Sequence, residues 1–220
     1  MPKISARARR TLTEERRKQI LDAASQVFAE KGFERATIAH VAKKAGIAEG
    51  SIYNYFKNKS DLLVSIPRQI IEPPVATISA VIQTNLSSQS IPPDEVLTLV
   101  AQNLIATFHK NAPIFRILIS NLPSMKPSMR EKYFKQAIML AIGTLEDYFA
   151  EQIKQGVFRK DLDSRIMARA FIGMFFPYLL FHEMAQLEID ESWEYERLIQ
   201  VAVPLFLQGA LAHPRKGPKP

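Results

Sequence analysis

The sequence of 220 residues contains no cysteine, one tryptophan and only eight glycines. Without cysteine, disulfide bonds, zinc–thiolate centres and cysteine nucleophiles are excluded, and the composition fits a reducing compartment. The basic N-terminus lacks the apolar segment of a secretory signal. The longest nearly apolar run, residues 170–181, is too short to cross a membrane and contains Gly173 and Pro177. We therefore expect a cytoplasmic protein that has no membrane partner.

Sequence motifs of common enzymes are also missing. The chain has no P-loop, no dinucleotide-binding glycine motif, no nucleophile elbow and no zinc-protease helix motif. Its four histidines, His40, His109, His182 and His213, lie far apart in the sequence. We predict that the protein is not an enzyme and has no metal site and no cofactor.

Charge is distributed unevenly along the chain. Of the net +7, residues 1–66 hold 13 Lys and Arg against 7 Asp and Glu, whereas residues 67–220 hold 16 against 15. A basic part beside a nearly neutral remainder indicates a polyanionic partner for the first part only. A merely solvated cationic face would give the same count, so charge alone leaves both interpretations open.

Helical periodicity begins after a basic opening. Up to about Thr13 there is no apolar pattern, so we expect a flexible arm there. Thr13 caps a helix whose apolar residues recur every three or four positions and which Gly32 ends. Thr37 starts a second helix that Gly46 ends, and a third helix is predicted over residues 49–56. The basic residues of the arm are Lys3, Arg7, Arg9 and Arg10.

The remainder of the chain has the pattern of successive amphipathic helices. No segment alternates polar and apolar residues as a strand does, so we predict an all-α protein. We place a smaller basic domain at residues 1–66, a larger helical domain at 67–212 and a disordered tail at 213–220. The expected breaks between helices include Pro73, Pro74, Pro92, Pro93, Pro113, Pro123, Pro127 and Gly156.

Residues 37–63, TIAHVAKKAGIAEGSIYNYFKNKSDLL, have the spacing of a helix-turn-helix followed by the start of another helix. Two short helices joined by a glycine turn allow the first to rest across a DNA backbone while the second enters the major groove. The same shape also occurs in proteins that never meet DNA. Together with the basic charge of this part, the pattern favours a DNA-binding domain.

The third predicted helix has two distinct faces. At about 100° per residue, Ile52 and Phe56 point toward their own domain, and Tyr53 and Tyr55 flank the opposite face. Small residues on that face permit close approach, an amide can bond a base edge, and tyrosine hydroxyls can reach phosphates. The outer face carries Gly50, Ser51 and Asn54.

Further candidate contacts to the DNA backbone surround this helix. The hydroxyl of Thr37 and nearby backbone N–H groups can hold a phosphate at the start of the second helix. Lys57 and Lys59 lie where the other strand should pass. Lys43 and Lys44 add positive charge, although both could simply be solvated.

The same segment resembles the DNA-binding domain of TetR-type transcriptional regulators. A second stretch, from Gly156-Val157-Phe158-Arg159 through Leu162 to Ala168-Arg169-Ala170, is similar to the joint before the penultimate helix of many members. The residues that match the DNA-binding domain are Gly32-Phe33-Glu34-Arg35-Ala36-Thr37, Ile38 to Ala42, Ala45-Gly46-Ile47, Gly50-Ser51-Ile52-Tyr53-Asn54-Tyr55-Phe56-Lys57-Asn58-Lys59 and Leu62-Leu63.

The resemblance implies a homodimeric regulator, usually a repressor, that binds a palindromic operator in double-stranded DNA. The last two long helices would form the dimer interface. Asn54 falls at the family's variable base-reading position. Glu49 departs from the family, which often has lysine or a small residue there, and an acid would either repel phosphate or accept from a cytosine amino group. The residues that match the family's backbone contacts are Thr37, Ser51, Tyr53, Tyr55 and Lys59.

The resemblance also implies an effector cavity in the C-terminal domain. If the cavity exists, the abundance of Phe and Met there favours an apolar or aromatic effector. The same side chains could instead form core and dimer contacts. The polar candidates for ligand contact are Asn103, His109 and Arg116, and the apolar candidates are Phe108, Phe115, Met139, Phe171, Met174, Phe175 and Tyr178.

A DNA-binding protein without a small-molecule effector, acting through a protein partner, is the alternative function. A roomy internal cavity would favour the effector, whereas a closed core would favour the protein partner. A dimer interface is expected in either case, because residues 166–181 are apolar on almost every face and would be exposed in a monomer.

Overall fold

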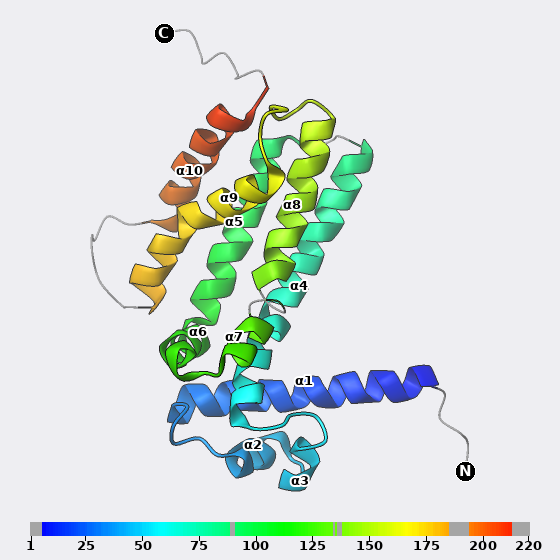
Figure 1. Cartoon of the computed structure of the whole chain (residues 1–220), viewed down its shortest axis with the longest axis vertical. Coiled ribbons are helices and arrows are strands. Elements are labelled where there is room, and N and C mark those ends of the chain that lie inside the picture. The colour runs from blue at the N-terminus through cyan, green and yellow to red at the C-terminus, as the bar shows by residue number, and fades with distance from the viewer. Residues whose placement is uncertain (1–5, 89–90, 134, 136–137, 185–193, 213–220) are drawn as a thin grey trace. The chain divides into compact units, whose positions relative to one another are not determined.

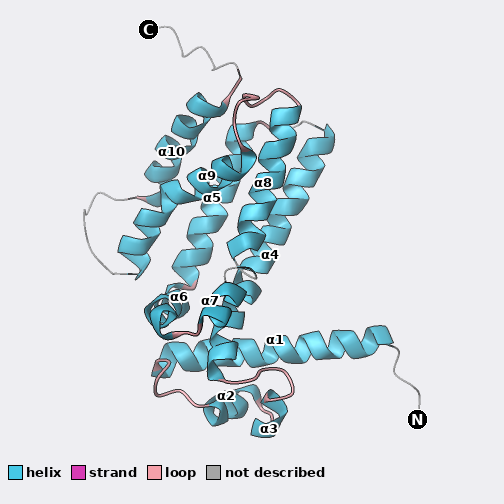
Figure 2. Cartoon of the chain, viewed as in Figure 1, coloured by secondary structure: helices cyan, strands magenta, loops and turns pink. Residues whose placement is uncertain are grey.

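The structure, a computed structural model, describes residues 6–88, 91–133, 135, 138–184 and 194–212. Helices dominate these ranges, which contain no strand beyond a bridge between Phe158 and Leu211 (Figures 1 and 2). The predicted all-α class is therefore confirmed. The elements are α1 (Ala6–Lys31), α2 (Ile38–Ala45), α3 (Glu49–Ile52), α4 (Lys59–Ser88), α5 (Pro93–Lys110), α6 (Ala112–Asn121), the 3-10 turn η1 (Leu122–Ser124), α7 (Pro127–Tyr133), α8 (Met139–Lys154), α9 (Ser164–Leu179), the π turn η3 (Leu180–Met184) and α10 (Tyr195–Ala210).

The chain divides into two compact units, and the first is built from two separate stretches. It comprises Met1–Ile70 and Pro113–Gln136, whereas the second comprises Ile71–Ala112 and Ala137–Pro220. The change at residue 70 lies close to the predicted boundary at residue 66. The inclusion of most of α6 and all of α7 in the first unit differs from the sequence prediction, which assigns them to the C-terminal domain. The predicted tail, 213–220, lies outside the described residues.

Helix α1 begins earlier than its apolar pattern indicates. Residues 6–13, predicted as an arm, belong to the helix, and only residues 1–5 precede the described part. Alanine and arginine, which alternate here, are strong helix formers and extend a helix without an apolar stripe. Gly32 ends α1 as predicted, with a left-handed φ of 74°.

The core of the first unit forms where α1, α2 and α3 meet the start of α4. The predicted inner face of α1 is buried, and the Phe33 ring lies 5.4 Å from that of Phe28, edge to face. The other buried apolar residues of α1 to α3, the turns between them and the start of α4 are Ile20, Leu21, Ala23, Ala24, Val27, Ala36, Val41, Ala42, Ala45, Ile52, Phe56, Leu62, Leu63, Val64 and Ile66.

Helix α4 runs without interruption through Pro67, Pro73 and Pro74. The break expected at the last two is therefore wrong. Each proline removes one intrahelical N–H donor, which weakens a helix but does not stop one that is held by packing. Here Ile71, Ile78 and the following turns are buried on one side and hold the helix past its prolines.

The second unit has an aromatic core between α5, α8, α9 and α10. Tyr148 and Phe149 of α8 meet Phe158, Phe171 and Phe206, with ring centroids between 5.2 and 6.5 Å apart. Three of these pairs are edge to face and three are tilted. Aromatic pairs at such distances stabilise a core beyond the area that they bury.

The joint before α9 ties together the ends of two helices. Gly156 adopts a left-handed φ of 77° after α8, and the Arg159 N–H donates to the carbonyl of Ala210 at 2.9 Å. Asp163 then caps α9 by accepting from the backbone N–H of Arg165. The predicted start of the penultimate helix is thus confirmed.

Candidate functional site

The turn between α2 and α3 has the geometry of a helix-turn-helix. Gly46 ends α2 in the left-handed conformation, with φ 67° and ψ 34°. Its N–H and that of Ile47 bond back to the carbonyls of Lys43 and Ala42. A residue with a Cβ is strained at this φ, which explains why glycine stands there.

Thr37 caps α2 as predicted, but its partner was not foreseen. Its hydroxyl oxygen accepts from the His40 N–H at 3.2 Å, and His40 Nδ1 accepts from the Thr37 N–H at 3.3 Å. This is a capping box in which histidine takes the place of the usual acidic residue or glutamine. A histidine three positions after a threonine was the only available sequence signal.

The regular helix of α3 is shorter than predicted, because it ends at Ile52 rather than Phe56. Backbone hydrogen bonds from Tyr55 and Phe56 to the Ile52 carbonyl continue the turn, at 2.9 and 3.0 Å. The predicted faces of this segment nevertheless hold, since Ile52 and Phe56 are buried while Gly50 and Asn54 are exposed.

The remaining predicted contacts on this segment lie at the edge of the exposed face. Tyr53 is 53% exposed, and Ser51 and Tyr55 are half-buried. Glu49, whose role the sequence left open, is exposed in the first turn of α3. A carboxylate there benefits from the partial positive charge of a helix start, although α3 is short.

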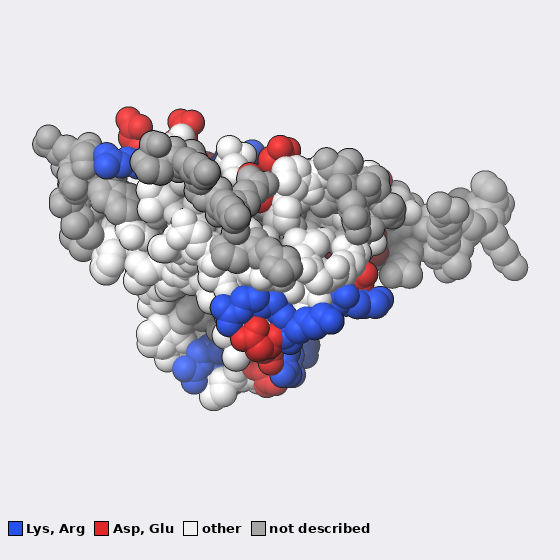
Figure 3. Space-filling view, turned by 90° about the horizontal axis from the view of Figure 1, so that it is seen from above, with Lys and Arg blue, Asp and Glu red and all other residues white. Residues whose placement is uncertain are grey.

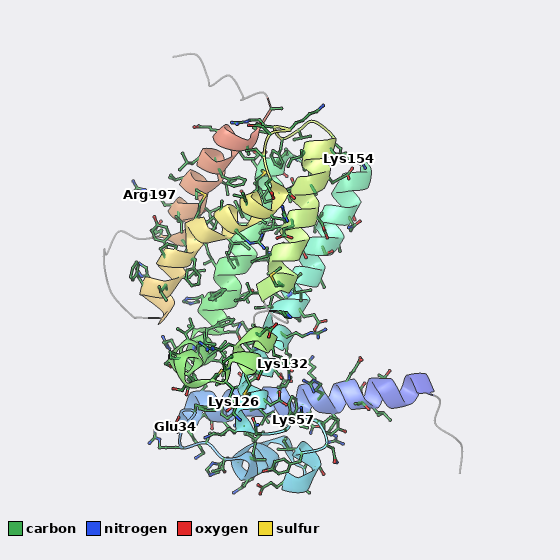
Figure 4. The ribbon with its side chains drawn as sticks, viewed as in Figure 1. Glu34, Lys57, Lys126, Lys132, Lys154 and Arg197 are labelled. Atoms are coloured by element: carbon green, nitrogen blue, oxygen red, sulfur yellow. The ribbon has the colours of Figure 1, made fainter. Side chains whose placement is uncertain are left out.

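The four predicted lysines have different surroundings. Lys43 and Lys57 are exposed, and Lys44 forms an ion pair with Glu30 at 3.0 Å. Figure 4 marks Lys57 beside the turn that follows α3. Lys43, Lys44 and Lys57 therefore all lie on the surface of this unit.

Lys59, by contrast, is half-buried and binds backbone carbonyls of its own unit. Its ammonium donates to the carbonyls of Phe33, Glu34 and Ala36, at 2.7, 3.2 and 3.0 Å, and lies 4.4 Å from the centre of the Phe33 ring. An ammonium has three N–H donors, so this geometry argues against the predicted phosphate contact. Lys59 instead fastens the α1–α2 turn to the start of α4.

Arg17 of α1 binds the segment after α3, a contact that the sequence did not predict. Its guanidinium donates to the Tyr55 carbonyl at 3.2 Å and to the Ser65 hydroxyl at 3.5 Å, and lies 4.3 Å above the Phe56 ring. Burial lowers the pKa of Arg17, although the nearby carboxylate of Asp61 opposes the shift. Arginine remains charged in proteins even so, and it anchors this segment to α1.

Asp61 binds the C-terminal end of the same segment, at Lys57. One carboxylate oxygen accepts from the Lys57 N–H at 3.0 Å, and the other accepts from the Lys132 ammonium at 2.5 Å. The Asp61 N–H donates to Asn58 Oδ1, which caps α4. Burial by itself would raise the pKa of Asp61, but the hydrogen bonds from Lys132 and Lys57 and the charges of Lys132 and Arg17 lower it below its ordinary value.

The predicted ligand contacts are divided between the two compact units. Phe115 is buried and Arg116 half-buried within the first unit, whereas the other eight belong to the second. Phe171 and Phe175 are fully buried with their ring centroids 5.3 Å apart. Helical spacing finds the buried face of each helix but does not show which helices share a core.

The remaining predicted contacts lie at different depths of the second unit. The Asn103 amide donates to the Leu99 carbonyl of its own helix at 2.9 Å. Asn103, Phe108, Met174 and Tyr178 are half-buried, and His109 and Met139 are exposed. The Tyr148 hydroxyl, not among the predicted contacts, is buried and has no hydrogen-bond partner among the described residues.

The last two long helices expose apolar side chains. Ile166 is 67% exposed on α9, and Val201 and Leu205 are each 60% exposed on α10. Phe176 of α9 and Phe181 of η3 are also exposed. A Cβ built at Gly173 of α9 would meet no atom within 4 Å. On the face drawn in Figure 3, uncharged side chains predominate and Lys and Arg gather along one edge.

The apolar run that the sequence predicts to be too short for a membrane lies within a longer helical segment. Residues 164–182 form 19 helical residues with a mean hydropathy of 1.2, enough by length and composition to span a bilayer, and 28% of that window is buried. The core helix of a soluble protein meets the same criteria. No cluster of possible metal ligands occurs among the residues that the structure describes.

The fold and the exposed face of α3 define an all-α DNA-binding transcriptional regulator of the helix-turn-helix class. The model for bacterial regulatory proteins of the tetR family matches residues 20–66, and that for the C-terminal domain of AefR-like transcriptional repressors matches residues 95–209. The chain belongs to the TetR family of transcriptional regulators, whose members are not enzymes.

Known proteins with related sequences and structures agree with this assignment. The fatty acid metabolism regulator protein of Bacillus subtilis is 29% identical over 160 residues, which cover 70% of this chain and 77% of that protein. The structure of FadR from Bacillus subtilis in complex with stearoyl-CoA is 25% identical, with a TM-score of 0.66 over 87% of this chain and 97% of that one. A TetR-family regulator from Mesorhizobium loti shares the fold, with a TM-score of 0.74 at 20% identity over 90% of this chain and 98% of that one.

Proposed function

We propose that this TetR-family regulator is a cytoplasmic homodimeric repressor that binds a palindromic operator through α3 and is released by a small, largely apolar or aromatic effector. The observation that supports the DNA contact best is the exposed amide of Asn54 opposite the buried anchors Ile52 and Phe56. An asparagine amide can donate to and accept from the edge of an adenine in the major groove.

The neighbours of Asn54 would position the protein on the DNA backbone. Gly50 and Ser51 permit close approach, while the hydroxyls of Tyr53 and Tyr55 reach phosphates on the groove walls. The Thr37 oxygen accepts from the backbone, which leaves its O–H free to donate to a phosphate. The positive charges of Lys43, Lys44 and Lys57 add a contribution that does not depend on sequence.

The homodimer is supported by the exposed apolar side chains of α9 and α10. A contiguous apolar surface is costly in water, and a second copy would cover it. Gly173 and Gly209 are exposed with open space at the Cβ position, which would permit close approach of the partner's helices. Two copies of α3 would then have to lie about 34–36 Å apart to enter successive major grooves.

The effector is supported by the relative that binds stearoyl-CoA, an apolar chain with a polar end. The buried Tyr148 hydroxyl would gain a hydrogen bond from a polar group of such a ligand, since an unpaired buried hydroxyl costs about 1–3 kcal/mol. The close aromatic packing around Phe149 and Phe171 instead favours the alternative, a DNA-binding protein that acts through a protein partner.

Selection of DNA from a random-sequence pool tests the DNA contact and the symmetry together. We expect a palindromic sequence bound by a dimer, and substitution of Val201 or Leu205 by Asp should give a monomer with weaker operator binding in sedimentation and anisotropy measurements. Ala106→Asp, on an exposed position of α5, is the matched control. A dimer that persists in both substituted proteins would contradict the assigned interface.

A panel of acyl-CoA thioesters and free aromatic acids tests the effector. Binding should raise the melting temperature, because a ligand of the native state stabilises it by mass action, and should lower the affinity for the selected operator. If no member of the panel has either effect, the protein-partner alternative is favoured.

A further inference from the structure

The α6–α7 segment belongs to the first unit but lies in the sequence between two stretches of the second. The described residues of the stretch 113–136 belong to the first unit, together with the DNA-binding helices, although the family model of the C-terminal domain runs through them. The segment follows α5 directly and leads into α8, and both of these helices belong to the second unit. It is therefore covalently joined at both ends to the unit proposed to bind the effector.

A single carboxylate of the first unit connects this segment to the turn after α3. Asp61 is 9% exposed, and its two oxygens have different partners. Oδ1 accepts from the Lys132 ammonium of α7 at 2.5 Å, and Oδ2 accepts from the Lys57 N–H at 3.0 Å. Figure 4 labels Lys132 and Lys57, whose ammonium and backbone N–H respectively make these two bonds.

The Lys57 N–H belongs to the short turn that carries the DNA-reading residues. It directly follows Phe56, whose ring lies beneath Arg17, and Arg17 also donates to the Tyr55 carbonyl. Asp61 and Arg17 thus hold two consecutive parts of this turn. Of these two anchors, Asp61 alone is bonded to the α6–α7 segment among the contacts of the described residues.

The bond between Lys132 and Asp61 is strong enough to influence the position of the turn. Ammonium–carboxylate hydrogen bonds are short and about twice as strong as neutral ones. The Asp61 side chain is only 12% exposed, so water competes weakly, whereas the Lys132 side chain is 35% exposed and can be changed without opening the core.

We propose that Lys132 is a positioning residue for DNA recognition, because its ion pair with Asp61 holds the turn after α3 in the orientation that reads bases and makes this orientation depend on the α6–α7 segment. The proposal rests on the proposed reading of DNA by α3. A displacement of α7 that breaks the pair would release one of the two anchors and lower the affinity for the operator without any change in a residue that touches DNA.

The test compares the full-length wild type with Lys132→Gln, Lys132→Arg, Asp61→Asn and the double variant K132Q/D61N. The probes are the duplex that the wild type selects from a random pool and an unrelated duplex of equal length. We expect Lys132→Gln to weaken binding to the selected duplex by about three- to thirty-fold, the range typical of residues that couple sites. Binding to the unrelated duplex and the salt dependence of binding should be unchanged. Lys132→Arg, which keeps a cation at this position, should bind the selected duplex as the wild type does. Asp61→Asn should cause little further loss of affinity in the Lys132→Gln background.

Lys135→Gln is the matched control, because Lys135 lies near Lys132 but pairs with Glu131 on an exposed face. Hydrogen exchange adds a readout that general destabilisation would not reproduce. In Lys132→Gln, the amides of residues 53–58 should exchange faster while those of α1 and α2 keep their rates.

Three results would overturn the proposal: unchanged affinity of Lys132→Gln for the selected duplex, an equal loss for Lys135→Gln, or an equal loss on both duplexes with a smaller salt slope, which would make Lys132 a phosphate contact. A wild type that selects no sequence at all would instead refute the proposed DNA reading, so the two failures are distinguishable.

Discussion

At the residue scale, Lys57 and Lys59 are only two residues apart in the sequence but have different surroundings. Lys57 is exposed beside the turn after α3, whereas the ammonium of Lys59 donates to three backbone carbonyls of the α1–α2 turn. A cation held in this way contributes to the stability of the unit, while an exposed one remains available to the phosphates of DNA.

Alanine substitutions should separate the two roles. Lys57→Ala should reduce the slope of log affinity against log salt by about one unit and leave stability nearly unchanged. Lys59→Ala should lower the free energy of unfolding by about 2 kcal/mol, since it removes charge-assisted hydrogen bonds, and should leave the salt slope unchanged. Urea unfolding and binding titrations at several salt concentrations measure both. The reverse pattern would restore Lys59 as a phosphate contact.

The partners of these residues explain what sequence could and could not predict. Ile52, Phe56 and Asn54 were placed on the correct faces because helical spacing within one segment determines them. The contacts of Lys59 and Arg17 were missed because their partners lie 23 to 48 positions away in the chain. Periodicity carries no information at that range.

At the scale of elements, the two glycines of the helix-turn-helix differ in backbone conformation. Gly46 has a left-handed φ of 67°, and Gly50 lies in α3 without such a constraint. A Cβ built at either position meets no atom within 4 Å. Only the backbone penalises alanine at Gly46, and only an incoming ligand would penalise it at Gly50.

Gly46→Ala should therefore destabilise the protein by about 1–2 kcal/mol, the cost of a left-handed conformation for a residue with a Cβ. Gly50→Ala should be neutral or stabilise by up to about 1 kcal/mol, because glycine is a poor helix former. If α3 approaches DNA closely, the second substitution should weaken operator binding in spite of this. Thermal unfolding and anisotropy give both results, and full affinity of Gly50→Ala would argue against close approach.

Asp61, in the first turn of α4, should make the free energy of unfolding depend on pH in the acidic range. The folded-state pKa of Asp61 lies below its ordinary value of 3.8, so folding favours the charged form. Its contribution is present above that ordinary value and is lost as the pH falls through the lower folded-state pKa. Asp61→Asn should be less stable than the wild type near neutral pH, and the difference should shrink as the pH falls below 3.8. Urea unfolding across this range tests the expectation, and a constant difference would contradict it.

Element boundaries were predictable where a residue imposes a backbone conformation. Thr37, Gly32 and Gly46 end or begin helices as expected, because capping and left-handed φ are local properties. The predictions for the start of α1 and for a break in α4 were wrong. An alanine- and arginine-rich segment needs no apolar stripe to be helical, and buried residues around Pro73 and Pro74 outweigh the donors that these prolines lack.

At the scale of the whole molecule, the division into units differs most from the sequence prediction. The α6–α7 segment belongs to the first unit together with Phe115 and Arg116, whereas the other predicted ligand contacts belong to the second unit. Contacts between distant stretches decide such a division, and a single sequence does not reveal them. The family, by contrast, and the helix proposed to read DNA follow from one local motif.

Two copies of α3 in a dimer should read the two halves of an operator in the same way. The most direct test of this account measures Asn54→Ala on every single-base variant of the selected duplex, with Gln102→Ala, an exposed residue of α5, as control. We predict a loss of about 1–3 kcal/mol that is confined to the preferred base at one symmetric position of each half-site. An equal loss on every sequence, or none, would show that the exposed face of α3 does not read bases.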